Sequence, residues 1–597
     1  MSLDDMKKEY VLVRRLLNVN IVPGCFSAAM LVAGNLIDAS VIGRCLGKTA
    51  LAAFGISNPL VFGILGLAGM LGIGAVIGLG DAIGKADREK MDRVLSTSLC
   101  SGMAAGLIIM TMMLLFSSGI ARMMGADAQL LREAGDYLTG YAFGVPAFFV
   151  YMILNYVMPI DSDRNRCVWA LIISTAVNIS LDLLNGYILH WGLLGMGLAT
   201  SVSVYAELIV LLLHFGRKEK MLRLSFLPFS PSILVSSIKN GLPFALQLLF
   251  KMLAIVLVNR IIVAVSDNET VAVFSVLISC NNLITIDATA VGVSTLTIDS
   301  CFAGEQDGAS MSCLISAALK HAIITNLLLT VLFELAAPLI VKLFVTDASF
   351  YAACVPAFRL YVTNIVFFAV NFILRSHLQS MKRYILSILY SCVEFLIAPI
   401  AAALAVVHIL GVDEIWLYCT IGEAAAFALF LLYICILRKR IPLCFNDYLL
   451  LPPELRSEEG ECLDYVIENK EGAINECVCA SEQAIIYLKT HGMQHRDAML
   501  MGVIVEELCK NVVEHGFSST KDIIEMRISR KNGSWQLRIR DNCRYFNVKE
   551  YFNLVDKNSE KYGLQIVKGL AGQVEYMSAL QINRLIVRMD EQKLSFE

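Results

Sequence analysis

The sequence is poor in charge and lacks the phosphate-binding loop that many ATP-driven pumps use. Only 17% of its 597 residues are Asp, Glu, Lys or Arg, whereas 57% are hydrophobic, and the mean hydropathy is +0.65. No Gly-x-x-x-x-Gly-Lys-[Ser/Thr] stretch occurs in it, which argues against primary pumping through such a loop. The formal net charge of −3 gives no reason to expect nucleic acid as a partner.

The cysteine spacing typical of disulfide frameworks or zinc sites is also missing. The 17 cysteines are scattered through apolar segments, and Cys477 and Cys479 stand too close together for a zinc pair. We therefore expect reduced thiols that pack as small hydrophobic side chains. The first ten residues are polar and charged, so no cleavable signal peptide is expected.

What the sequence does contain is a succession of long apolar runs that stops at Arg438-Lys439-Arg440. A helix needs about 20 largely apolar residues to cross a bilayer, and continuous runs favour helices over the alternating strands of a barrel. The residues after the break have the charge density of a soluble domain. Twelve spans are predicted, at 16–42, 50–80, 93–119, 134–158, 168–188, 193–215, 241–265, 270–300, 313–342, 355–380, 384–410 and 415–437.

Basic residues gather in the connectors on one side of the predicted spans. They include Arg14, Arg15, Lys85, Arg88, Lys90, Arg93, Arg164, Arg166, Lys382 and Arg383. The opposite connectors carry few, among them Arg44 and Lys342. By the positive-inside rule, this asymmetry predicts a multi-pass protein of the cell membrane whose two termini and soluble tail lie in the cytoplasm.

The apolar part repeats itself at an offset of about 220 residues. The stretch Gly84-Lys-Ala-Asp-Arg-Glu-Lys-Met91 returns as Gly304-Glu-Gln-Asp-Gly-Ala-Ser-Met311, and Pro23 returns as Pro243. Each half holds six spans, an even number, so the halves share one orientation and are parallel repeats. Lobes are predicted at 1–220 and 221–440, followed by a linker at 441–461 and a soluble domain at 462–597. Such a pair of lobes can rock about a central cavity.

Acidic residues within the first lobe are candidates for an ion site, because charge at membrane depth is costly and usually marks a pathway or a partner. Asp38 lies deep in the first span, and Asn178 and Asp182 stand four residues apart on one helix face of the fifth. Thr200 follows in the sixth span. Carboxylate, amide and hydroxyl oxygens suit a small hard cation, and two close carboxylates raise each other's proton affinity.

The paired six-span halves, this Asp and Asn-x-x-x-Asp pattern and the Gly-Lys-x-Asp loop resemble the MATE (multidrug and toxic compound extrusion) transporters over about residues 14–440. The resemblance implies an all-α polytopic membrane protein of twelve helices in two six-helix lobes. It implies that Asp38, Asn178, Asp182 and Thr200, with Asn155 nearby, bind the coupling cation. That cation is Na⁺, held by Asp38 and Asp182, or H⁺. Pro23, on the span of Asp38, is the candidate hinge.

The second lobe also carries ionisable residues in its spans. Asp287, Lys251 and Glu394 are candidates for contact with an amphipathic substrate. A neutralising pair of Asp287 with Lys251 or Arg260 is the alternative interpretation. The residue pattern leaves both open.

The tail reads as a mixed α/β domain. Helices are predicted at 481–491, 497–515 and 564–571, and alternating residues predict strands at 525–529, 535–540, 573–577 and 583–589. A turn over 531–534 contains Asn-Gly and predicts a hairpin between the first two strands. These elements together form an α/β sandwich.

Three tail motifs, Glu506-Glu-Leu-Cys-Lys-Asn511, Asp541-Asn-Cys543 and Tyr562-Gly-Leu-Gln565, resemble the histidine-kinase-like ATPases of the Bergerat type, most closely the anti-sigma-factor kinases. The resemblance assigns catalysis to Glu507, Mg²⁺ binding to Asn511, adenine recognition to Asp541 and phosphate approach to Gly563. Cys543 and Gln565 stand where the family has glycine, and a Cβ there hinders close approach to phosphate. Weak or absent turnover of ATP is expected.

These features predict a cation-coupled antiporter that exports amphipathic organic compounds and carries a nucleotide-binding regulatory tail. The expected partners are the lipid bilayer, a small amphipathic substrate, adenine nucleotide with Mg²⁺ and a regulatory protein. Two alternatives remain. One is a membrane-anchored signalling protein whose tail phosphorylates a serine of an anti-sigma-antagonist-like partner, and the other is a lipid flippase. Whether the chain is an enzyme is left open by the sequence.

Overall fold

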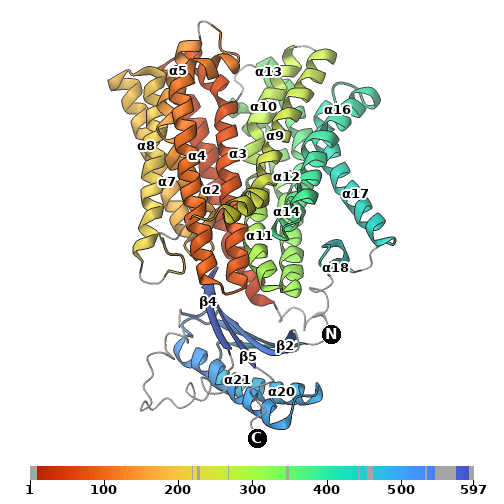
Figure 1. Cartoon of the computed structure of the whole chain (residues 1–597). Coiled ribbons are helices and arrows are strands. Elements are labelled where there is room, and N and C mark those ends of the chain that lie inside the picture. The colour runs from red at the N-terminus through yellow and green to blue at the C-terminus, as the bar shows by residue number, and fades with distance from the viewer. Residues whose placement is uncertain are drawn as a thin grey trace.

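In the computed structural model, a helical membrane domain packs against a small domain that contains a β-sheet (Figure 1). The structure describes residues 10–127, 130–217, 220–224, 229–266, 268–344, 348–441, 444–452, 462–531, 534–544 and 573–589. Ten of the helices there are long and apolar enough to cross a membrane, and two bent helix pairs bring the number of spans to twelve. The predicted succession of apolar spans is therefore confirmed, with ten to twelve spans in the described residues.

Six spans form the first lobe. They are α2 (Val11–Cys45), α3 (Lys48–Gly84), α4 (Arg88–Met123), the pair α5 (Leu131–Ala142) and α6 (Val145–Val157), α7 (Arg164–Leu184) and α8 (Gly192–Leu212). The helices α5 and α6 meet at 54°. Pro23 lies inside α2, which stays helical on both sides of it.

The second lobe follows the same plan. Its helices are α9 (Pro231–Val265), α10 (Asn268–Ile284), α11 (Ile286–Glu305), α12 (Gly308–Phe344), α13 (Ala348–Val362), α14 (Ile365–Ser380), α15 (Tyr384–Cys392), α16 (Ala398–Ile409) and α17 (Tyr418–Arg438). The bent pair here is α10 with α11, at 48°. A π-helical turn, Val393–Ile397, joins α15 to α16 and carries Glu394.

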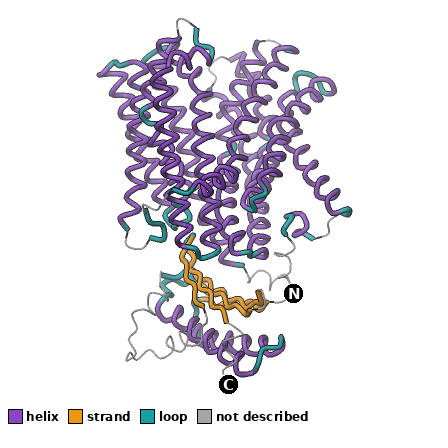
Figure 2. The backbone as a smooth tube through the Cα atoms, viewed as in Figure 1, coloured by secondary structure: helices purple, strands orange, loops and turns teal. Residues whose placement is uncertain are grey.

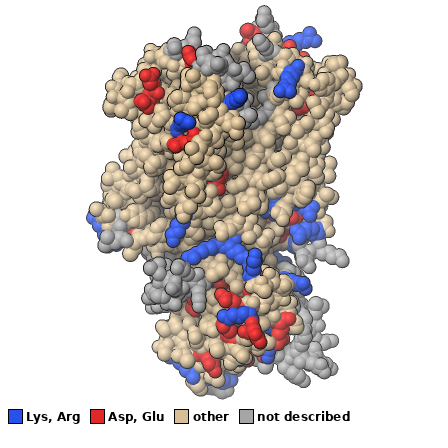
Figure 3. All heavy atoms as spheres, turned by 180° about the vertical axis from the view of Figure 1, so that it is seen from behind, with Lys and Arg blue, Asp and Glu red and all other residues tan. Residues whose placement is uncertain are grey.

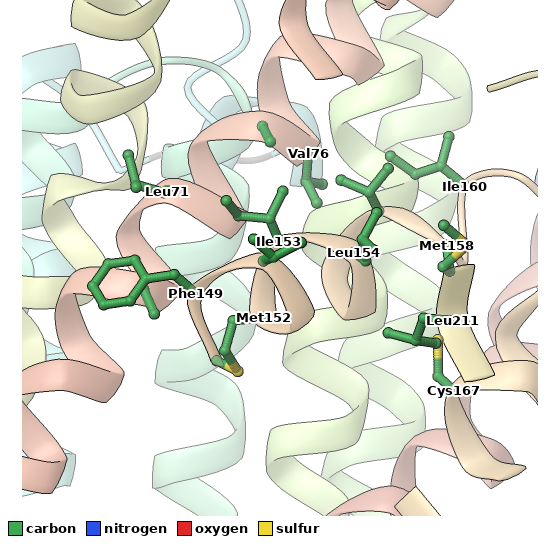
Figure 4. Close-up of a cluster of buried hydrophobic side chains, with 14 of the residues drawn as sticks. Leu71, Val76, Phe149, Met152, Ile153, Leu154, Met158, Ile160, Cys167 and Leu211 are labelled. Carbon is green, nitrogen blue, oxygen red and sulfur yellow. The ribbon is translucent and has the colours of Figure 1, made fainter. Parts of the chain in front are cut away.

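Apolar packing holds the first lobe together. Figure 4 shows Val76 of α3, Phe149 and Ile153 of α6 and Leu211 of α8 in one buried cluster. Large apolar side chains such as Leu115 remain exposed on the outer surface, as expected for helices that face lipid. In the space-filling view the membrane domain is largely uncharged, and Lys and Arg form a band where it meets the tail (Figure 3).

The sequence repeat is reproduced in backbone geometry. Ala86 and Gln306 have φ of 53° and 56°, a left-handed conformation that is uncommon for residues with a Cβ. The next residue in each half caps a helix: Asp87 accepts the Lys90 N–H at 2.9 Å and Asp307 accepts the Ser310 N–H at 3.1 Å. A second pair of turns repeats as well, because Ser162 and Lys382 have φ of 60° and 58°.

The tail is a five-stranded antiparallel sheet with two helices on one face. The strands are β1 (Cys462–Glu468), β2 (Ile523–Lys531), β3 (Ser534–Asp541), β4 (Gln573–Ala579) and β5 (Ile582–Met589), in the order β1-β2-β3-β5-β4. The helices α20 (Ala473–Thr490) and α21 (His495–His515) lie on the side away from the membrane domain (Figure 1). The sheet thus lies between two helical layers, as the orange strands in Figure 2 show.

The tail differs from the sequence interpretation in two places. Strand β1 was not predicted, and α20 begins at Ala473, eight residues before the predicted helix start at 481. The predicted helix at 564–571 and the turn residues 532–533 lie outside the described residues, although Lys531 and Ser534 pair across the hairpin as expected. The linker contains a short helix, α18 (Phe445–Tyr448), followed by three buried leucines at 449–451. All 17 cysteines are free thiols.

Candidate functional site

The structure brings the two first-lobe acids together. The carboxyl groups of Asp38 on α2 and Asp182 on α7 lie close enough to interact directly. A hydrogen bond between them requires that one of them carries a proton, because two ionised carboxylates can only accept. Asp182 is 2% exposed, and its Oδ1, like the Oδ1 of Asp38, has no hydrogen-bond partner among the described residues.

The other predicted ion ligands differ in their burial and in their hydrogen-bond partners. Asn178 is buried one helical turn before Asp182, and its Nδ2 is unpartnered within the described part of the chain. The Thr200 hydroxyl donates to the Met196 carbonyl at 3.1 Å and contacts Tyr137. Tyr137 also lies near both acids; no charge or motif marked it in the sequence. The backbone carbonyl of Asn155 accepts a hydrogen bond from the Cys167 thiol.

This set of groups fits a small cation or a proton. Unpartnered carboxylate oxygens beside an amide and a hydroxyl are the donors that a hard cation prefers. Among the described residues, no group of three or more His, Cys, Asp and Glu side chains is placed to hold a metal ion.

A second buried polar cluster lies in the second lobe. Arg375 of α14 forms an ion pair with Glu394, and both side chains are at most 2% exposed. Asn371 donates to Glu423 Oε2 at 2.6 Å, and Lys251 lies within electrostatic reach of Glu423 and Arg375. Lys251 and Glu394 were separate candidates in the sequence. In the structure they belong to one cluster through Arg375 of α14 and Glu423 of α17.

Asp287 has partners other than those predicted. Its Oδ2 accepts from Asn326 at 2.8 Å and its Oδ1 lies 3.3 Å from His321 Nε2. Both partners are on α12, whereas the sequence suggested Lys251 or Arg260. The Cys25 thiol of α2 reaches Asp287 from the first lobe at 3.8 Å, so Asp287 faces the interface between the lobes.

The tail residues assigned to nucleotide binding are placed on one side of the sheet. Glu507 and Asn511 lie one turn apart on α21, and the Asn511 amide donates to the Glu507 carbonyl at 2.5 Å. Asp541, at the end of β3, accepts from Asn583 at 2.8 Å and from the Cys543 N–H at 3.0 Å. Burial raises the pKa of Asp541 to about 6, although these bonds oppose the shift. Gly563 lies outside the described residues.

The fit of the tail to Mg²⁺ and ATP rests on two of these residues. Asp541 is a buried carboxyl of the type that can accept an adenine amino group, and Asn511 has an amide oxygen free to turn toward a metal once its bond to Glu507 is broken. His515 is the last residue of α21 and is exposed, as a helix-end residue would be.

The opposite face of the sheet carries arginines that are buried against the membrane domain. Asp307 accepts from Arg538 at 2.6 Å, from Arg540 at 2.9 Å and from Arg527 at 3.3 Å. Burial alone would raise the pKa of Asp307, but these guanidiniums hold it well below its usual value. This contact cannot be predicted from the sequence pattern, because its two sides are more than 200 residues apart.

Comparison with known proteins gives two family matches. The MatE family matches residues 23–184, and the histidine kinase-like ATPase domain matches residues 480–589. The chain thus carries a MatE domain in its first lobe and a histidine kinase-like ATPase domain in its tail.

Curated relatives align with parts of the membrane domain. The probable multidrug resistance protein YoeA of Bacillus subtilis is 23% identical over 315 residues, which cover 51% of this chain and 66% of the relative. The multidrug export protein MepA of Staphylococcus saprophyticus is 22% identical over 239 residues, which cover 40% of this chain and 53% of the relative. The chain therefore spans between about half and two thirds of these relatives.

Solved structures share the fold of the membrane domain. An outward-facing multidrug resistance MATE family transporter of the MOP superfamily superimposes with a TM-score of 0.67 at 23% identity, over 70% of this chain and 95% of the other. A MOP superfamily transporter from Pyrococcus furiosus gives a TM-score of 0.66 at 23% identity, with the same coverage.

Proposed function

Because a MatE domain is joined here to a histidine kinase-like ATPase domain, we propose that the chain is a cation-coupled antiporter that exports amphipathic organic compounds. The coupling cation is Na⁺ or H⁺, and transport proceeds by rocking of the two lobes. The tail binds adenine nucleotide and regulates this cycle from the cytoplasm. The names of two relatives state probable multidrug resistance for one and multidrug export for the other, which supports this class of substrate.

The observation that carries the proposal is the contact between Asp38 and Asp182. The two carboxyls come from helices α2 and α7, and α2 also packs against α11 of the other lobe. Binding or release of a cation changes the charge between α2 and α7, and thereby biases the position of α2. Pro23 lies on the same helix, between this pair and the tail-side end, and removes one backbone hydrogen bond where α2 would bend.

The second-lobe cluster supports an organic substrate. Arg375, Glu394 and Glu423 are buried and Lys251 is partly buried, so the cluster offers charged groups of both signs. Charge at membrane depth is retained where it meets a substrate or an ion. Asp287, at the interface between the lobes, is a further contact for a cationic group.

The test is export from energised vesicles by Asp38→Asn and Asp182→Asn. Each variant is expected to fold and insert normally and to lose coupled export, because an amide can neither carry the proton nor neutralise the cation. Asp136→Asn is the matched control, since Asp136 is an exposed first-lobe acid 4.0 Å from Arg132. Normal export by both site variants would refute the coupling role of the pair.

A further inference from the structure

One face of the tail sheet is built to meet the membrane domain. Side chains alternate between the two faces of a strand, and the positions opposite α20 and α21 carry charge. The buried charged residues there are Arg527 of β2, Arg538 and Arg540 of β3, and Arg584 of β5. We call these four residues the arginine face. Four guanidiniums would not be buried without acidic partners.

Most of those partners lie on one turn of the second lobe. Glu305, at the end of α11, forms ion pairs with Arg540 and, at 2.9 Å, with Arg584. Asp307 binds three members of the arginine face, and the Ser310 hydroxyl accepts from Arg540 at 2.9 Å. The equivalent position to Glu305 in the first lobe is Lys85, which pairs with Asp81 at 3.0 Å.

Arg584 joins the two lobes through a single side chain. Its Nη2 donates to the backbone carbonyls of Ile83 at 2.9 Å and Gly84 at 3.2 Å, at the end of α3. Its Nη1 lies 2.9 Å from Glu305 of the second lobe. A planar guanidinium has donors pointing in several directions, so one residue can bind both lobes at once.

The turn between β4 and β5 provides another contact with the first lobe. The Leu580 N–H donates to the Ile160 carbonyl at 2.8 Å, and the Gln581 N–H donates to the Ser162 hydroxyl at 2.6 Å. Both turn residues have positive φ, 57° and 61°, a conformation that Asn-Gly adopts far more readily. Met577 and Leu580 pack into the apolar core of the membrane domain.

The two lobes are closed against each other on this same side. The backbones at Gly84 and Gly304 approach so closely that a side chain at either position would collide. Asp81 of the first lobe is 3.0 Å from Lys382 of the second, and Arg164 donates to Ser294 across the interface at 3.2 Å.

We propose that the arginine face is a clamp that holds the tail-side ends of the two lobes together. The lobes separate on this side only when the tail releases at least one of them. This clamp rests on the proposed function in one respect: lobe separation is a step of transport only if the chain is a transporter that works by rocking of its lobes. The contact itself is independent of substrate or coupling ion, because every group in it belongs to the tail or to the tail-side turns.

The decisive variant is Arg584→Gln, which removes the bridge between the lobes. Arg588→Gln is its matched control: Arg588 lies on the same strand, is half exposed and pairs with Glu575 of the tail at 3.3 Å. Glu305→Gln tests the same bridge from the membrane side. All are studied in the full chain in lipid nanodiscs, with neither ion gradient nor substrate.

Two thiols report on two different events. Cys301, 3% exposed, lies beneath the tail beside Glu305, Arg540 and Arg584 and reports undocking. Ser237→Cys places a thiol on α9 where Ser237 packs against Gly74 of the other lobe, and reports lobe separation. N-ethylmaleimide labelling is followed by mass spectrometry. Exposed Cys479 serves as the reference, and fully buried Cys477 reports whether the tail stays folded.

Arg584→Gln and Glu305→Gln are expected to speed labelling at both reporter positions by about tenfold or more, because each leaves buried charge unpaired. Arg588→Gln is expected to change neither, and Cys477 stays protected in all three. Faster labelling of Cys301 without faster labelling at position 237 would overturn the clamp, because the tail would then dock without holding the lobes. Unchanged labelling at both positions would overturn it as well. Neither result depends on export, so a failed export assay leaves this test intact.

Discussion

At the residue scale, Asp307 and its repeat equivalent Asp87 allow helix capping to be separated from ion pairing with the tail. Both aspartates cap a helix in the same way, at 3.1 and 2.9 Å. Only Asp307 also accepts from three arginines of the tail. The repeat therefore supplies an internal control, in which the cap is constant and the ion pairs are present on one side alone.

Asp307→Asn is expected to weaken docking of the tail by about 3–5 kcal/mol, because three buried guanidiniums lose an anionic partner. Asp87→Asn should change it by less than about 0.5 kcal/mol, since Asn caps helices nearly as well as Asp. The measurement is hydrogen exchange of the Leu580 and Gln581 amides, which bond to the first lobe. Equal exchange in the two variants would contradict the role given to the ion pairs.

Glu525 makes docking dependent on pH. Its carboxylate accepts the Leu12 N–H at 2.9 Å, and burial raises its pKa to about 7, although that bond and nearby arginines oppose the shift. The docked state therefore binds a proton that a free glutamate releases near pH 4.5. Docking weakens as the pH rises from about 4.5 to about 7 and is level above that. The arginines that face Glu525 are Arg527, Arg538 and Arg540.

Glu525→Gln is expected to remove this dependence, because the amide oxygen still accepts from Leu12 and does not titrate. The ratio of Cys301 labelling in wild type to that in the variant, taken at each pH, cancels the ionisation of the thiol itself. The ratio should rise between pH 5 and pH 7 and then stay constant. A ratio that falls over this range would show that the sign is wrong.

At the scale of elements, strands β3 and β5 connect the two faces of the tail. Arg540 pairs with Arg584 across them and faces the membrane domain, whereas the next pair, Asp541 and Asn583, faces α21. Docking fixes the position of Arg540 and Arg584 and thereby orders Asp541 and Asn583. The entropy lost when nucleotide binds at Asp541 is then smaller. Nucleotide binding and docking should therefore support each other, and by equal amounts.

ATP with Mg²⁺ is expected to slow labelling of Cys301 in the wild type, and Asp307→Asn should weaken ATP binding by the same factor. Asn511→Ala should abolish the effect of ATP, while the exposed Glu482→Gln leaves it unchanged. Binding is measured on the full chain by calorimetry. If ATP binds but speeds labelling of Cys301, the two faces oppose each other and the preorganisation argument fails.

The elements that sequence analysis located were those with a strong local pattern. The apolar runs gave twelve spans, and strands were predicted at the positions of β2, β3, β4 and β5. Strand β1 follows a charged stretch of the linker and was missed; its antiparallel pairing with β2 identifies it in the structure. The alternation of β2 and β3 predicted strands but gave no partner for their arginines. Their partners stand more than 200 positions earlier, and a local pattern carries no information about them.

At the scale of the whole molecule, basic residues mark the side on which the tail lies. Lys90, Arg164 and Lys382 all occur at the tail-side ends of helices, and the space-filling view shows a basic band there (Figure 3). Positive charge is retained on the cytoplasmic side during insertion. The proposed orientation of the chain follows from this asymmetry together with the position of the tail.

A green fluorescent protein fused after Glu597 is therefore expected to fluoresce in cells, and an alkaline phosphatase fused at the same point is expected to be inactive. The control is the same pair of reporters inserted after Gly411, in the turn that follows α16 on the far side of the membrane domain (Figure 1). That site should give the reverse result. Phosphatase activity at the C-terminus would place the tail outside the cell.

The exchange of Lys85 for Glu305 between the repeats has a consequence for how the chain assembles. If the two turns were equivalent, the tail could dock at either of two positions related by a half rotation, with nearly equal free energy. Lys85 in the turn of the first lobe repels the arginine face, whereas Glu305 in the turn of the second lobe attracts it. Divergence of this turn between the duplicated halves thus disfavours the second docking position and directs the tail to the turn of the second lobe.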